Sequence, residues 1–418
     1  MDILFLIIYI VLNLFVFARS LFLKDGVFSP GFILSYTSVF IFVPQLFSIY
    51  NNPLTNYYST GLFYYVIISC NLFFFLGFYL KIPQKENKWK IDFDLEKLSI
   101  INVLFSLIGF STLFIFSGTY NQAEDNVIPV FLKTFSRVSL CLSIILIVNR
   151  KVKVVVLLSF VLSLIPLIYY AFFLKGSRSE GLFLIINMSW FCFLLLRKNY
   201  YLRTIVKIVF VSFLLGGTII SSKIVDIRND YYKENSSKIV EPSFDSYLDS
   251  YKAGFEQKDY ENGMDIRNAF IAINYVRDQN EYDFGLQVWN MLVVNYVPRR
   301  LVGADVKESL IIKFNYQPFV QKLTHGVTTS TAYFNAFSAF SYLGFLMFFG
   351  FGFLLNFLWS FKYFSTFFLF IILFFNSFLV SIFNHSFSYF WTPLVFLLII
   401  TLLLYYLKVL KFFKLARK

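Results

Sequence analysis

Residues 154–196 read VVVLLSFVLSLIPLIYYAFF, LKGSRSEG and LFLIINMSWFCFLLL in succession, which is two apolar runs joined by a short charged turn. An apolar run of about 20 residues, at a helical rise of about 1.5 Å per residue, crosses a hydrocarbon layer about 30 Å thick. Strands of a barrel would instead show short alternating segments. The pattern predicts two transmembrane helices joined by a turn that carries Lys175, Arg178 and Glu180.

The same pattern recurs along the 418 residues, of which 58% are hydrophobic and 15% are charged. A soluble protein would carry about a quarter charged residues. We therefore expect an all-α polytopic membrane protein with about 11 transmembrane helices, in the range of roughly 10–12. The start, MDILFLIIYIVLNLFVF, lacks a cationic segment and a cleavage site, so we expect a retained first helix. The expected spans are roughly 2–23, 30–50, 59–81, 98–117, 129–149, 154–174, 179–196, 205–222, 334–357, 363–384 and 388–408.

Lys and Arg cluster in alternate connections between these spans. About twenty of the 37 Lys and Arg residues lie there, and the charge bias of membrane proteins places such segments in the cytoplasm. The N-terminus is then outside and the C-terminus inside. The net charge of +13 is therefore explained by the orientation of the chain in the membrane, and no nucleic acid partner is expected. The clusters are Arg19 with Lys24, KIPQKENKWK (81–90), RKVK (150–153), RKNYYLRTIVK (197–207), Lys362 and KVLKFFKLARK (408–418).

One connection is much longer than the others and divides the chain. We expect an N-terminal transmembrane bundle over 1–222, a large outer loop over 223–333, and C-terminal transmembrane helices with a basic tail over 334–418. The loop holds 15 Asp and Glu against 13 Lys and Arg, so it is nearly neutral. Its stretches NAFIAINYVRDQ and FGLQVWNMLVVNYV have helical periodicity, and Pro298 ends the second. The loop is therefore expected to be a partly helical cap.

Four cations on the expected outer side run against the charge bias. Lys175 and Arg178 lie in the hairpin turn, whereas Lys133 and Arg137 lie in the apolar stretch VFLKTFSRVSLCLS. Residues four apart share a face of a helix. Arg137 lies about two turns inside the run, where charges are costly and usually functional. The alternative explanation for the turn is that Lys175 and Arg178 bind lipid phosphates or are simply solvated, and for Lys133 and Arg137 it is that their side chains extend to the outer lipid headgroups.

Further candidates lie within the loop and where it re-enters the membrane. His325 lies in THGVTTSTAYFNAFSAF, and Thr328 and Thr329 have hydroxyl groups that can cap a helix or bind sugar hydroxyls. Arg299 and Arg300 come from VPRRLVG. With the four cations, they describe a cation-lined site at the outer membrane surface. Because arginine forks match phosphate oxygens, a diphosphate linked to a lipid fits such a site.

Several other sequence patterns are weaker indications of function. Asp92 and Asp94 have the D-x-D spacing of metal-binding nucleotide-sugar enzymes, but their connection is too short for a nucleotide-binding domain, so helix capping is expected. Cys70, Cys141 and Cys192 lie inside apolar runs and suggest neither a disulfide nor a metal site. The sequence contains no Walker A loop, no H-E-x-x-H and no zinc spacing. We expect no metal and no cofactor.

The chain resembles the Wzy-type repeat-unit polymerases of bacterial O-antigen and capsule synthesis. The resemblance covers the whole architecture. It is carried by KGSRSEG as an outer turn, a single large outer loop late in the chain, YVPRRLVG within that loop, and HGVTTSTAYFNAFSAFSYLGFLMFFGFG leading back into the membrane. One departure is an odd number of spans with an outside N-terminus, since family members often have both ends inside.

The resemblance implies a GT-C-like fold, similar to that of O-antigen ligases, in the bacterial cytoplasmic (inner) membrane. It implies a glycosyltransferase that joins undecaprenyl-diphosphate-linked oligosaccharide repeat units without a metal. Arg178 matches the outer-turn arginine of the family, and Arg299 matches the arginine of its Pro-Arg loop motif. His325 lies where the related ligases carry a histidine. Membrane lipids, a chain-length regulator and the flippase of the same pathway are the implied partners.

In the implied reaction, a hydroxyl of one lipid-linked unit attacks the anomeric carbon of the growing chain, and undecaprenyl diphosphate leaves. Arg178, Lys133, Arg137 and Arg299 would stabilise the charge on the diphosphate. His325 is the first choice of general base, and a loop carboxylate is the second.

Two other functions stay open. A ligase would use the same donor and transfer the chain to lipid A core. A lipid-linked oligosaccharide flippase, or another transporter, would place polar groups near the midplane in repeated halves, whereas these spans are nearly free of charge at mid-depth.

Overall fold

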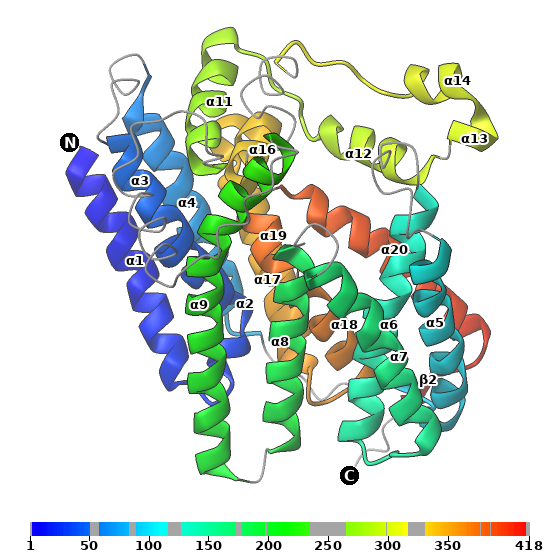
Figure 1. The fold of residues 1–418 in the computed structure, drawn as a ribbon. Helices are drawn as coiled ribbons and strands as arrows, with labels where there is room; N and C mark the ends of the chain where they lie inside the picture. Colours follow the sequence, from blue (N-terminus) through cyan, green and yellow to red (C-terminus); the bar gives the residue numbers. More distant parts are fainter. Residues whose placement is uncertain are drawn as a thin grey trace.

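The chain folds into a bundle of upright helices with a layer of shorter helices over its upper end (Figure 1). This computed structural model describes residues 2–50, 58–82, 89–115, 127–172, 178–196, 199–233, 265–297, 299–316, 331–376, 378–384 and 386–414. The first half of the bundle comprises α1 (Asp2–Phe22), η1 (Gly26–Phe28), α2 (Pro30–Tyr36), the π-helical η2 (Thr37–Phe42), α3 (Val43–Tyr50), α4 (Thr60–Tyr79), α5 (Leu95–Ile115), α6 (Val127–Val148), α7 (Val154–Phe172), α8 (Arg178–Leu195) and α9 (Tyr200–Lys233).

The second half begins with α16 (Thr331–Phe340), η5 (Ser341–Leu343), α17 (Phe345–Phe361), α18 (Thr366–Asn376), α19 (Leu379–Asn384) and α20 (Ser388–Tyr406). The upper layer, called the cap from here on, contains α11 (Asp265–Gln279), α12 (Leu286–Tyr296), α13 (Arg299–Val302) and α14 (Ala304–Ser309). The two helices expected within the loop are thus confirmed as α11 and α12. Strands β1 (Trp89–Phe93) and β2 (Leu410–Lys414) pair at the lower end.

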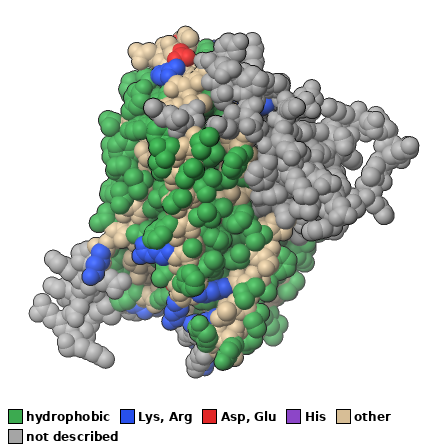
Figure 2. All heavy atoms as spheres, turned by 90° about the vertical axis from the view of Figure 1, so that its left-hand side faces the viewer, with side chains coloured by type: hydrophobic (Ala, Val, Ile, Leu, Met, Phe, Trp, Pro, Cys, Tyr) green, Lys and Arg blue, Asp and Glu red, His purple; other side chains and the backbone are tan. Residues whose placement is uncertain are grey.

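Large apolar side chains cover the flank of the bundle (Figure 2). Ile7 of α1, Val155 of α7 and Ile208 of α9 are among the exposed ones. Such a surface is costly in water and favourable against lipid. Among the described residues, five helices are long and apolar enough to span a membrane, or six if one bent pair counts as a span. The expected number of about 11 spans stays a prediction.

The span expected over 334–357 is not one straight helix. Its two parts, α16 and α17, meet at 116° with η5 between them. Ser341 has a positive φ of 53°, and a Cβ on Gly344 would lie 2.5 Å from the Ala336 carbonyl oxygen. This close approach, which a glycine allows, lets the chain turn back over α16. The span expected over 363–384 is likewise divided, into α18 and α19.

The boundaries expected for the large loop fall inside helices. Helix α9 continues beyond position 222 to Lys233, so the first boundary lies within it. Helix α16 begins at Thr331 and is buried along almost its whole length, so its first turn belongs to the bundle rather than to the loop. Hydrophobicity marks where an apolar run ends, but a helix can continue as long as its backbone bonds do.

The cationic connections meet at the lower end. Strand β1 lies between α4 and α5, and it pairs antiparallel with β2, which follows α20. The Lys411 ammonium lies 2.7 Å from the Asp94 carboxylate. Asp94 also accepts bonds from the Glu96 and Lys97 N–H groups and so caps α5, as expected. Asp92 instead accepts from the N–H and hydroxyl of Thr366, at 2.8 Å each, and so caps α18.

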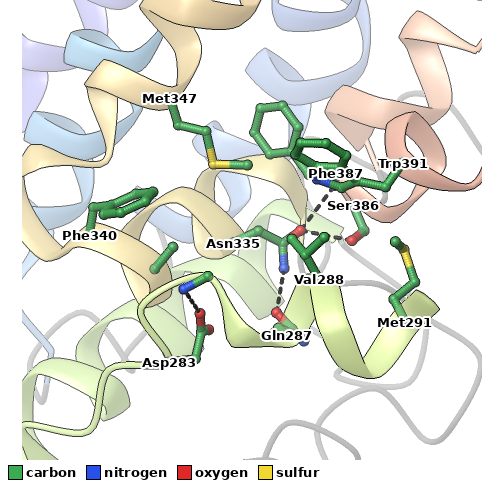
Figure 3. Close-up of a pocket in the computed structure, with 12 residues that line it drawn as sticks. Asp283, Gln287, Val288, Met291, Asn335, Phe340, Met347, Ser386, Phe387 and Trp391 are labelled. Atoms are coloured by element: carbon green, nitrogen blue, oxygen red, sulfur yellow. Dashed lines mark hydrogen bonds between the residues drawn. The ribbon is translucent and has the colours of Figure 1, made fainter. Parts of the chain in front are cut away.

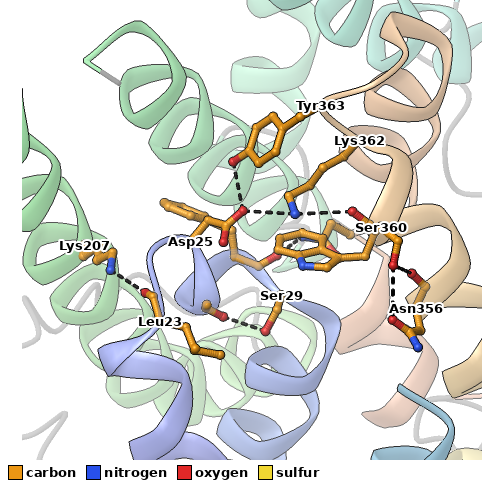
Figure 4. Close-up of polar contacts among 12 residues, drawn as sticks. Leu23, Asp25, Ser29, Lys207, Asn356, Ser360, Lys362 and Tyr363 are labelled. Atoms are coloured by element: carbon orange, nitrogen blue, oxygen red, sulfur yellow. Dashed lines mark hydrogen bonds and ion pairs between the residues drawn. The ribbon is translucent and has the colours of Figure 1, made fainter. Parts of the chain in front are cut away.

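Asp25, in the first connection, joins two more parts of this lower end (Figure 4). Its carboxylate lies 3.0 Å from the Lys362 ammonium, after α17, and accepts a 2.9 Å bond from the Tyr363 hydroxyl. The Lys207 ammonium of α9 donates to the Leu23 carbonyl oxygen at 2.6 Å. The alternate connections that carry the cations therefore lie at one end of the bundle, opposite the cap.

Candidate functional site

Lys133 and Arg137 lie on one face of α6, as their spacing predicts. The Lys133 ammonium lies 4.3 Å from the centroid of the Tyr170 ring on α7. The Arg137 guanidinium carbon lies 4.5 Å from the centroid of the Phe378 ring and 5.3 Å from that of the Phe183 ring on α8. Both cations therefore point toward aromatic rings of neighbouring segments, where each contact is worth about 0.5–2 kcal/mol.

This face of α6 is held in place by its surroundings. The rings of Phe183 and Phe378 are 1% and 6% exposed. The Tyr170 hydroxyl donates to the hydroxyl of Thr112 on α5 at 2.9 Å, which fixes the ring beneath Lys133. A binding site needs charges whose directions are fixed by packing, and the two α6 cations meet this requirement.

The beginning of α8 lies close to the α6 cations. This helix begins at Arg178, and Phe183, which contacts Arg137, follows five residues later, a rise of about 7.5 Å along the helix axis. The beginning of α8 and the charged stretch of α6 are therefore neighbours in space. The side chain of Arg178 and the whole of Lys175 lie outside the described residues.

The other predicted site residues lie elsewhere or outside the described part of the chain. Arg299 begins α13, at the upper right edge of the cap in Figure 1, and its guanidinium lies 3.9 Å from the carboxylate of Glu308 on α14. For Arg300 only the backbone, in α13, is described. His325, Thr328 and Thr329 lie outside the described residues.

A cavity of about 470 Å³ lies between the cap and the bundle (Figure 3). Small-molecule sites typically have about 300–1,000 Å³ and an apolar lining with a few polar groups. The cavity fits that description. It is lined by Asp283, Gly285, Gln287, Val288, Met291, Asn335, Ala339, Phe340, Met347, Ser386, Phe387 and Trp391.

Asn335 of α16 joins the walls of this cavity (Figure 3). Its amide nitrogen donates to the Gln287 side-chain oxygen on α12 at 3.0 Å. Its amide oxygen accepts from the Ser386 hydroxyl at 2.8 Å and from the Phe387 N–H at 3.1 Å. One side chain therefore connects the cap to the segment that leads into α20.

Asp283 fixes the loop between α11 and α12, which borders the cavity. Its N–H donates to the Ser338 carbonyl oxygen of α16 at 2.8 Å, and its carboxylate accepts from the Gly285 N–H at 2.7 Å and from the Tyr316 hydroxyl at 2.8 Å. Burial, together with the charge and hydrogen bond of Asp283, raises the pKa of the Tyr316 hydroxyl. Phe284 is 73% exposed at a φ of 48°, a strained conformation that often marks function.

A network of uncharged polar groups lies inside the bundle. The Asn71 amide nitrogen of α4 donates to the Asn13 side-chain oxygen of α1 at 3.0 Å and to the Ser38 hydroxyl of η2 at 2.9 Å. The Tyr333 hydroxyl of α16 donates to the Asn71 oxygen at 2.7 Å. These four side chains are fully buried, and the network passes through a π-helical segment, a feature frequent at functional sites.

Sequence reasoning missed the residues of the cavity. Asp283, Gln287, Asn335, Ser386 and Trp391 come from three segments, and none forms a motif with its neighbours. The one sequence feature that could have indicated the cavity is Asn335, a polar residue inside an apolar stretch. Within the described part of the chain, no group of three or more His, Cys, Asp or Glu side chains is placed to hold a metal ion.

The apolar flank, the long helices and the absence of any larger sheet among the described residues define an all-α polytopic membrane protein. Comparison of the chain with models of protein families, with curated proteins and with solved structures gives no match.

Proposed function

We propose that this protein is a glycosyltransferase with a GT-C-like fold that polymerises undecaprenyl-diphosphate-linked oligosaccharide repeat units into O-antigen or capsular polysaccharide. The observation that carries the proposal is the placement of Lys133 and Arg137 beside the beginning of α8, which starts at Arg178. Both cations lie in the first half of α6, and the basic connection 150–153 follows its other end. The charge bias assigns the side away from the basic connections to the outside of the cytoplasmic membrane. No metal or cofactor takes part in the proposal.

In the proposed reaction an acceptor hydroxyl oxygen bonds to the anomeric carbon of the donor chain. The bond from that carbon to the diphosphate oxygen breaks, and its electron pair leaves with undecaprenyl diphosphate. Lys133, Arg137 and Arg178 neutralise the charge that develops on the diphosphate. His325 accepts the hydroxyl proton, and the cap holds the two lipid-linked units in line.

Polymer length in a strain that depends on this chain tests the proposal. Arg178→Ala and Arg137→Ala should each leave mostly single repeat units, since loss of a preorganised charge contact commonly lowers rates about 10²–10³-fold. Lysine at either position should restore only part of the length, because a point charge lacks the guanidinium fork. The matched control is Arg19→Ala, since the Arg19 guanidinium also lies over a ring, 4.4 Å from the Tyr79 centroid, but near the lower end. Normal polymer from both upper-end variants, at normal protein levels, would refute the proposed site.

A transporter of lipid-linked oligosaccharides is the second candidate, because transporters use broken helices and polar groups inside the bundle. The 116° bend between α16 and α17 and the network around Asn71 favour it.

An assay in detergent micelles separates the candidates, because micelles have no second side to which a lipid could be moved. Polymer formed by purified protein from lipid-linked units supports the polymerase. Failure in micelles, with translocation in vesicles, supports the transporter. Transfer of whole chains to added lipid A core supports a ligase.

A further inference from the structure

We propose that the cavity between the cap and the bundle binds an uncharged sugar segment of the lipid-linked repeat unit. This inference rests on the proposed function for the identity of the ligand. The cavity itself, and its selectivity for neutral over acidic sugars, rest on the geometry of its walls.

The polar groups of the cavity match sugar hydroxyls, which both donate and accept hydrogen bonds. The Asn335 amide nitrogen carries two N–H groups, and its bond to Gln287 uses one of them. The Gln287 side chain, which also lines the cavity, accepts that bond with its oxygen, and its amide nitrogen is a further donor group. Side-chain amides are suited to pairs of neighbouring hydroxyls, because one group offers both a donor and an acceptor.

The apolar groups of the cavity match the carbon–hydrogen faces of a sugar ring. Phe340, Phe387 and Trp391 supply aromatic surface, and Met347 and Val288 supply aliphatic surface. The indole N–H of Trp391 is buried and has no hydrogen-bond partner. A buried donor without an acceptor costs about 1–3 kcal/mol. In the proposed complex a sugar oxygen accepts a hydrogen bond from this N–H, which would remove the cost.

The charge of the cavity selects against acidic sugars. The described lining residues include no Lys, Arg or His, and their single charged group is the Asp283 carboxylate. Among these described residues a uronic acid would meet no cation to offset its lost hydration, and Asp283 would repel it. The cavity therefore discriminates by an unfavourable charge as well as by favourable contacts.

Helix α20 connects this cavity to α6. Trp391 lines the cavity, and Phe396, five residues further along α20, packs on Phe135 with the ring centroids 5.3 Å apart. Phe135 lies between Lys133 and Arg137 in sequence. Residues two apart on a helix do not share a face, so Phe396 packs on the side of α6 opposite that of the two cations. The cavity is therefore a subsite separate from the cation site, on the other side of α6.

Binding of free trisaccharides to the full chain in lipid nanodiscs tests the inference. The probes are maltotriose and triacetylchitotriose, which are neutral, and trigalacturonic acid, which is acidic. At least one neutral probe should bind at least tenfold more tightly than the acidic one, a difference of about 1.4 kcal/mol. Tighter binding of the acidic probe, or no binding of either neutral probe, would overturn the proposal.

Two pairs of variants place the binding in this cavity. Val288→Trp fills it, whereas Val294→Trp changes an exposed residue of the same helix that does not line it. Trp391→Phe removes the indole N–H, whereas Trp289→Phe makes the same change outside the cavity. The first member of each pair should weaken the neutral probe at least tenfold, and the second should leave binding within twofold. Equal effects within each pair would contradict the assignment.

Measuring polymer length, together with trisaccharide binding, shows whether the sugar site or the proposed function is wrong. If neutral trisaccharides bind in the cavity but the wild-type protein forms no polymer, the proposed function fails and the sugar site stands. If the wild-type protein forms polymer and Val288→Trp forms polymer of normal length, the cavity is not the repeat-unit site and the inference fails.

Discussion

Asp283 joins the cap to the bundle with one carboxylate and one N–H group. It connects the loop after α11 to Tyr316 and to Ser338 of α16. Burial, together with the charge and hydrogen bond of Asp283, raises the pKa of the Tyr316 hydroxyl. Since the folded-state pKa lies above the unfolded one, the stabilisation is present below about pH 10 and is lost only as the pH rises through the folded value.

A double-mutant cycle measures this contact. Asp283→Ala should lower the free energy of unfolding by about 1–3 kcal/mol, because the Tyr316 hydroxyl would be buried without its acceptor. Tyr316→Phe should cost less, and the double variant should lose less than the sum of the two. Thermal unfolding in detergent gives the comparison, with Tyr282→Phe as a control on the same loop. Strict additivity would show that the two groups do not interact.

The candidate site could be predicted from the sequence only where a residue broke a pattern. Lys133 and Arg137 were found because a charge inside an apolar run is costly. Asn335 and Trp391 were not found, since neutral residues in apolar runs are common and acquire their role from partners far along the chain. The partners of Asn335 lie about 50 residues away on either side, at Gln287 and Ser386.

At the scale of elements, the contact between α4 and α17 depends on two glycines. A Cβ on Gly352 of α17 would lie 2.3 Å from the Phe74 carbonyl oxygen of α4, and one on Gly77 would lie 2.4 Å from the Phe349 carbonyl oxygen. Small residues at such crossings allow close helix packing within membranes. Here the backbones themselves are in contact, so a side chain could be accommodated only if the helices separate.

Gly352→Ala should therefore lower the stability of the bundle, by roughly 1–3 kcal/mol for an overpacked interface. The control is Gly350→Ala on the same helix, where a Cβ meets no atom within 4 Å. That change should be neutral or slightly stabilising, because alanine favours the helix. Melting temperatures of the two variants in the same detergent check the prediction, and equal melting temperatures would contradict it.

The helices were predictable and their interruptions were not. Apolar runs of sufficient length determine where a helix forms, which is why α1, α4, α5 and α7 lie within a few residues of their expected bounds. The 116° turn between α16 and α17 depends on Gly344 approaching Ala336. Hydrophobicity carries no information about such a contact, because both sides of the break are equally apolar.

At the scale of the whole molecule, the separation of the basic end from the cap predicts orientation. In a background without the three native cysteines, Lys313→Cys in the cap should react with an impermeant maleimide on intact cells. Lys151→Cys, after α6, should react only once the membrane is permeabilised. Both lysines are exposed, so access depends on the side of the membrane alone. The reverse pattern would move the α6 cations to the cytoplasmic side and remove the basis of the proposed function.

The ion pair between Lys411 and Asp94, beside the paired strands β1 and β2, predicts that the protein is less stable at acidic pH. The hydrogen bond from Lys411 holds the pKa of the Asp94 carboxyl below its usual value. Its stabilising effect is therefore present above about pH 4 and is lost as the pH falls through the lower folded-state value. Asp94→Asn keeps a side chain able to cap α5 but removes the charge.

The melting temperature of Asp94→Asn should thus fall below that of the wild type near pH 7 and approach it below about pH 3. Because Lys411 is half-exposed, added salt should reduce the difference at neutral pH. A difference that stays constant from pH 7 to pH 3 would show that the Asp94 charge plays no part. Lys411→Gln should reproduce the effect of Asp94→Asn.

The two strands of this small sheet lie far apart in the sequence, so they are synthesised at different times. Strand β1 leaves the ribosome about 300 residues before β2, which at about 5–20 residues per second is a delay of roughly 15 to 60 seconds. During that time the edge of β1 has no β2 to pair with, although α5 and the helices after it are already being inserted. A chain that ends before residue 410 therefore has an open β1 edge, the kind of surface on which chains aggregate.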